Sequence, residues 1–120
     1  MKTPHPLFVV ALAASVAGCA TGPGTKGFSP AQSVYALEGA YASALHGAVA
    51  YRNLPVCPSV QVCHSPAVVA RLIAADDKAH AALVTAETVV RAHGAQAQIT
   101  AALTSAQQLI ATFAAQVTPP

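Results

Sequence analysis

The sequence has no tryptophan, few aromatic residues and few charges of either sign. Aromatic residues make up 5% of the chain and charged residues 8%. Six lysines and arginines stand against four aspartates and glutamates, so the chain lacks the basic excess that is typical of nucleic-acid binding. Uncharged side chains must therefore cover most of the surface, which favours association. We expect no nucleic-acid partner, and a protein partner or a homo-oligomer formed through helix faces.

Catalytic motifs are also missing from the sequence. It has no Ser-His-Asp order, no glycine-rich loop for phosphate and no paired glutamates. Glu38 and Glu87 fit ordinary positions on helix surfaces, and His5 belongs to the N-terminal segment. The sequence therefore predicts a protein that is not an enzyme, and we expect no cofactor.

The N-terminal residues have the three parts of a secretory signal. Lys2 supplies a positive charge, Leu7 to Ala17 form an apolar run, and small residues follow. The run is too short to cross a bilayer as a helix, which takes about 20 residues. We expect this segment to direct export and then to be removed.

The end of the apolar run resembles the lipobox of bacterial lipoproteins. Val16, Ala17, Gly18 and Cys19 match its aliphatic, small, Gly or Ala, and Cys positions. The resemblance implies that Cys19 receives a diacylglycerol, becomes the first residue of the mature protein and is then acylated. Ala20 in place of Asp implies the outer membrane, with the domain on its periplasmic face. The alternative is an ordinary secretory signal cleaved near Ala17 or Ala20.

The rest of the chain is predicted to be one all-α domain on a tether. Glycines and a proline make the first residues after Cys19 flexible. The predicted divisions are a signal peptide over 1–18, a tether over 19–28, a three-helix bundle over 29–117 and a tail over 118–120.

Start and stop signals delimit three helices. Ser29-Pro30 begins the first, with Gln32 completing a capping box, and Ser65-Pro66 repeats the signal. Pro55 disfavours helix in the residue before it, and Gly94 is a natural stop. The predicted helices cover about 30–54, 66–93 and 96–117.

Each predicted helix has one apolar face, with residues recurring every three or four positions. Short connections then force an antiparallel up-down-up bundle. The alternative is one long kinked helix over 66–117. Gly39 and Gly47 lack side chains that would keep a neighbouring helix away. The three faces are Val34, Leu37, Tyr41, Leu45 (or Ala44), Ala48 and Tyr51; Val69, Leu72, Ala79, Leu83, Ala86 and Val90; and Ile99, Leu103, Ala106, Ile110, Phe113 and Val117.

Once Cys19 carries lipid, Cys57 and Cys63 remain as a pair in the first connection. An exported protein with an even number of cysteines favours a disulfide. The alternative is a redox-active or metal-binding pair, in which His64 beside Cys63 lowers the pKa of the thiol.

Asp76 interrupts the apolar face of the second helix. Either it contacts Arg52 or a tyrosine hydroxyl of the first helix and fixes the helix register, or the face rotates and exposes it. Asp76 and His80 are also four residues apart on one helix face, which makes them weak candidates for a metal site, with His46 as a possible third ligand. We predict no metal site, because this spacing is common.

These observations predict a non-catalytic, membrane-anchored envelope lipoprotein that acts as a structural or interaction module. The mature part resembles small Ala-rich envelope and prophage-encoded lipoproteins. One alternative is an accessory subunit of an envelope or phage lysis assembly, comparable to the outer spanin lipoproteins. Another is a periplasmic metal-binding or redox protein that uses Cys57, Cys63 and histidines.

Overall fold

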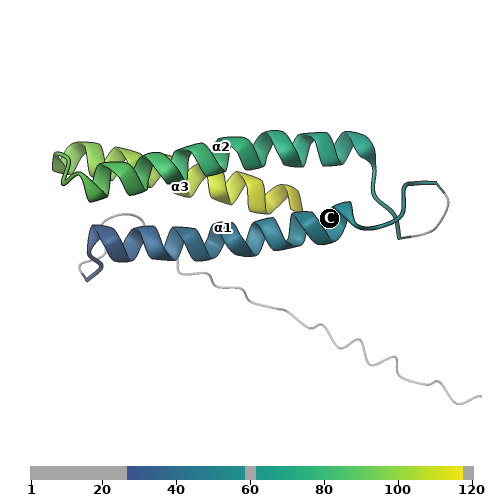
Figure 1. The fold of residues 1–120 in the computed structure, drawn as a ribbon, viewed down its shortest axis with the longest axis horizontal. Coiled ribbons are helices and arrows are strands. Elements are labelled where there is room, and N and C mark those ends of the chain that lie inside the picture. Colours follow the sequence, from purple (N-terminus) through teal and green to yellow (C-terminus); the bar gives the residue numbers. More distant parts are fainter. Residues whose placement is uncertain (1–26, 59–61, 118–120) are drawn as a thin grey trace, which may run out of the picture.

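Three helices pack against one another in the computed structural model, which describes residues 27–58 and 62–117. They are α1 (Pro30–Arg52), α2 (Pro66–Arg91) and α3 (Gln96–Val117), shown side by side in Figure 1. The described residues contain no strand, only one isolated bridge between Val56 and His64. The all-α prediction is confirmed, and the single helix over 66–117 is wrong.

The first two helices begin at the predicted serines by different means. Ser29 forms the expected capping box: its side chain accepts from the Gln32 N–H at 3.3 Å, and its own N–H donates to Gln32 Oε1 at 2.8 Å. Ser65 makes no such side-chain bond. Its carbonyl oxygen accepts from the N–H groups of Val68 and Val69, both at 3.0 Å.

Helices α1 and α2 each end two residues before the predicted position, at Arg52 and Arg91. His93 adopts a left-handed φ of 51°, so it takes the place that the sequence assigned to Gly94. The N–H of His93 donates to the Val90 carbonyl at 3.1 Å, and that of Gly94 to the Val89 carbonyl at 3.0 Å. These two bonds form a Schellman motif, which ends the helix without a glycine at its left-handed position.

The core consists of two clusters of buried apolar residues. The cluster nearer the connection between α1 and α2 surrounds Phe113, which is completely buried, and the other surrounds Ala86 and Ala106. All but one of the predicted residues on the face of α3 are buried, and Val117 is half-buried. The buried residues are Val34, Ala44, Leu72, Ala79, Leu83, Ala86, Ile99, Leu103, Ala106, Ile110 and Phe113.

One of the two glycines of α1 lies at a close helix contact. A Cβ atom added to Gly47 would lie 2.5 Å from Cγ1 of Val117, the last residue of α3. A Cβ atom added to Gly39 would meet no atom within 4 Å. The close approach expected at both glycines therefore occurs only at Gly47.

This difference predicts opposite effects for two identical substitutions. Gly39→Ala should raise the free energy of unfolding by about 1 kcal/mol, because alanine favours helix. Gly47→Ala should instead lower it by roughly 1 kcal/mol, because the clash with Val117 outweighs the gain in helix propensity. Urea unfolding measures both, and Val117→Ala should restore the gain in the Gly47→Ala background. Equal stabilisation by the two alanines would contradict the contact.

Candidate functional site

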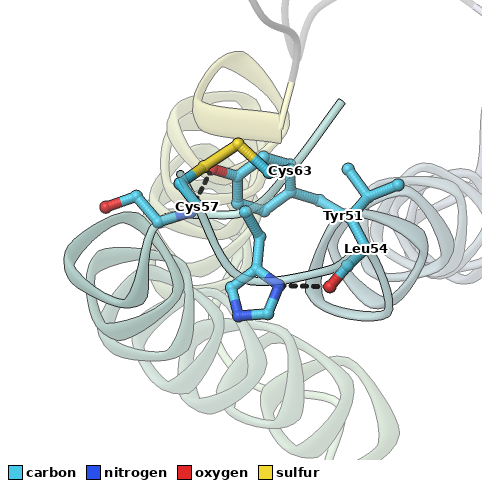
Figure 2. The surroundings of a disulfide bond; sticks show 6 residues. Tyr51, Leu54, Cys57 and Cys63 are labelled. Atoms are coloured by element: carbon cyan, nitrogen blue, oxygen red, sulfur yellow. Dashed lines mark hydrogen bonds between the residues drawn. A yellow bond between two sulfur atoms is a disulfide. The ribbon is translucent and has the colours of Figure 1, made fainter. Parts of the chain in front are cut away.

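The connection between α1 and α2 is closed by a disulfide between Cys57 and Cys63, whose Cα atoms are 5.1 Å apart. Figure 2 shows the disulfide beside Tyr51 and Leu54, at the end of α1. The predicted disulfide is confirmed. The sulfur atoms are bonded to each other, so neither offers the thiolate that a metal-binding or nucleophilic cysteine requires.

Backbone hydrogen bonds bring the two sides of this connection together. The Cys57 N–H donates to the His64 carbonyl at 3.1 Å, and the His64 N–H donates to the Pro55 carbonyl at 2.8 Å. Both bonds lie next to the disulfide in the chain. The covalent bond and the hydrogen bonds therefore constrain the same short segment.

Two side chains attach the connection to the ends of the helices. The Tyr51 hydroxyl accepts a hydrogen bond from the Ser65 N–H at 3.0 Å, at the start of α2. Nδ1 of His64 bonds the Leu54 carbonyl oxygen, and the ring of His64 lies edge-on to that of Tyr51. Because a carbonyl oxygen only accepts, Nδ1 carries the proton in this bond. His64 thus has a structural role beside the disulfide.

Asp76 lies in a polar contact between α1 and α2. The Tyr41 hydroxyl donates a hydrogen bond of 2.7 Å to Asp76 Oδ1, and the carboxylate is half-buried. The Tyr41 ring also contacts His80 and Phe113, at centroid distances of 5.8 and 6.1 Å. Of the two partners that we considered, the tyrosine hydroxyl is the one observed, whereas the alternative of an exposed aspartate is wrong.

This environment raises the pKa of Tyr41 from 10.0 to about 12. Burial is the largest cause, followed by the hydrogen bond to Asp76 and the negative charges of Asp76 and Asp77. All of these effects disfavour the phenolate. The contact therefore holds the tyrosine in its neutral, hydrogen-donating form.

The shift predicts a loss of stability at alkaline pH. The pKa of Tyr41 is higher in the folded chain than in the unfolded chain. The contribution of the neutral Tyr41 hydroxyl to stability is therefore complete below pH 10 and is lost as the pH rises towards about 12. Tyr41→Phe should remove this dependence and cost about 1.5 kcal/mol at neutral pH. Urea unfolding across the pH range and tyrosinate absorbance measure it. Tyr35→Phe is the control, since Tyr35 is 72% exposed. A Tyr41→Phe protein with the original alkaline transition would exclude Tyr41 as its source.

The weak metal candidates do not gain a third ligand. Asp76 and His80 both lie beside Tyr41, but in the part of the chain that the structure describes, no group of three histidine, cysteine or carboxylate side chains is placed to hold a metal ion. His46 is exposed on α1 and does not form part of such a group. The geometry here supports a helix-to-helix contact.

A groove of about 720 Å³ between α2 and α3 was not predicted from the sequence. Arg71 and Lys78 line it from α2, and Thr112 and Gln116 from α3. The signal for the groove that the sequence offered was the spacing of these two basic residues, which are seven positions apart on one helix. Their position relative to α3 depends on how α2 and α3 pack, and this packing could not be predicted from the sequence.

Comparison with protein-family models, curated proteins and solved structures finds no match to this chain. Within residues 27–58 and 62–117, no helix is long and apolar enough to cross a membrane. The proposed signal peptide (1–18), Cys19, most of the tether (19–28) and the tail (118–120) lie outside the described residues.

Proposed function

We propose that the chain is a lipid-anchored envelope lipoprotein whose helical domain is a structural or interaction module. The observation that carries this proposal is the sequence Val16-Ala17-Gly18-Cys19 after an apolar run. The disulfide between Cys57 and Cys63 supports export, because structural disulfides persist in oxidising compartments. Two or more acyl chains would then hold the domain stably at the membrane.

The domain that we propose to be presented is an antiparallel up-down-up bundle. The short connection at residues 92–95 favours this arrangement. Two contacts agree with it: Gly47, late in α1, lies beside Val117 at the end of α3, and Val34, early in α1, belongs to the same cluster as Ile99 near the start of α3. The disulfide and the tether would then lie at opposite ends of α1, leaving the long faces accessible to a partner.

The anchor is tested by feeding an alkyne fatty acid to cells that produce the full chain. The original protein should incorporate the label and stay with membranes after a high-salt wash. Cys19→Ser should lose both properties, whereas the matched control with Cys57→Ser and Cys63→Ser should keep both. An unlabelled original protein in the soluble fraction would reject the lipid anchor. Ala20→Asp tests the location separately: it should move the labelled protein from outer to inner membranes.

A further inference from the structure

The groove between α2 and α3 is lined mostly by apolar and small residues. Val68 and Leu72 from α2 and Leu109 and Val117 from α3 are its larger apolar residues. Ala74 and Ala75 also line it from α2, and their short side chains take up little of the space. With about 720 Å³, the groove falls within the range of ~300–1,000 Å³ that small-molecule sites occupy.

The groove is elongated along the helices. Its lining on α2 runs from Val68 to Lys78, which is about 15 Å at 1.5 Å per residue. Tyr51 lies at the Val68 end, where its hydroxyl is already bonded to the Ser65 N–H. This shape suits an extended alkyl chain better than a compact ring.

The charge of the groove is entirely positive. Arg71 and Lys78 line it, and no aspartate or glutamate does. Among the described residues the one ion pair joins Arg91 to Glu87, so no carboxylate pairs with either cation of the groove. The opposite side presents the neutral Thr112 and Gln116. An occupant that complements these walls has an apolar body and one anionic end.

We propose that this groove binds the anion of a long-chain fatty acid. The carboxylate lies beside Lys78, and the alkyl chain runs towards Val68 and Val117. The methylene groups of Arg71 cover the chain, and its guanidinium adds to the positive charge of the groove. This site lies within the folded domain, so it does not depend on the proposed lipid on Cys19.

The test uses a photoactivatable fatty acid added to membranes that contain the full chain. After irradiation and digestion, the label should map to α3 residues that line the groove, Leu109 and Val117, within the tryptic peptide 92–120. Excess unlabelled fatty acid should remove the label. The alcohol and the quaternary ammonium of the same chain length should compete at least tenfold less well, because they lack the negative charge.

Variants test the named residues. Lys78→Gln should reduce labelling of peptide 92–120 about tenfold, and Arg71→Gln about threefold. Ala74→Phe should abolish labelling by filling the groove with both cations intact. The matched controls Arg52→Gln and Ala42→Phe alter residues that do not line the groove, keep the cleavage after Arg91 and should label normally. Circular dichroism checks that each variant keeps its helices.

Several outcomes would overturn the proposal. The first is equal competition by the alcohol or the ammonium analogue, which would mean that charge does not select the ligand. The second is labelling by a photoactivatable phosphatidylglycerol but not by the fatty acid, which would assign the groove to a phospholipid. The third is label confined to the N-terminal segment or absent from the chain. All three are measured on the original protein, so they hold even if a variant fails to fold.

Discussion

Replacing Cys57 and Cys63 together by serine is expected to lower the free energy of unfolding by about 2 kcal/mol. The two cysteines are six positions apart and close a short loop. On the chain-entropy model, closing a loop of this size lowers the conformational entropy of the unfolded chain. This stabilises the folded state by roughly 2 to 2.5 kcal/mol. Urea unfolding under oxidising conditions measures the loss.

Two controls separate the disulfide from other effects of the substitution. Adding reductant to the original protein should reproduce the loss, and adding it to the double variant should change nothing. Cys19→Ser should leave the free energy of unfolding unchanged, because Cys19 is not part of this loop. An unchanged stability in the double variant would mean that the hydrogen bonds of the connection hold it without the covalent bond.

The same variant should loosen one end of the domain selectively. The disulfide lies beside the bond between Tyr51 and Ser65, and the connection between α2 and α3 is fixed separately by the bonds of His93 and Gly94. Hydrogen exchange should therefore accelerate more at Ser65 than at Gly94. Equal acceleration at both positions would indicate a global loss of stability without a local one.

Much of the fold could be predicted because local signals and periodicity agree with it. In α3, apolar residues recur at helical spacing from Ile99 to Val117, and the structure buries that face. The capping box of Ser29 and Gln32 requires only neighbouring residues, so it follows from the sequence. The disulfide followed from counting cysteines in a chain expected to be exported.

Other features depend on geometry that no local pattern contains. A left-handed residue is commonly glycine, yet His93 takes this position, because two hydrogen bonds of the helix end at residues 93 and 94 fix the backbone there. Arg52 and a tyrosine of the first helix were equal candidates for the contact partner of Asp76. Only the packing of α1 on α2 selects Tyr41. The groove arises in the same way, from the rotation of α2 against α3.

Phe113→Ala is the substitution expected to cost most, about 3 to 5 kcal/mol. Phe113 is completely buried, and several other buried positions, including Ala44, Ala79, Ala86 and Ala106, carry only a methyl group. Phe113 is the large side chain that is fully buried among the described residues, and it belongs to one of the two core clusters. Because small domains are stable by only about 5–15 kcal/mol, this change should remove a large part of the total.

The same substitution at a second, exposed phenylalanine serves as the control. Phe28 is 67% exposed, so Phe28→Ala should change the free energy of unfolding by less than about 0.5 kcal/mol. Phe113→Leu should fall between the two, because leucine retains part of the buried volume. Thermal and urea unfolding of the three variants would give this order. Similar losses for Phe28→Ala and Phe113→Ala would mean that burial of the Phe113 ring does not set the stability of the bundle.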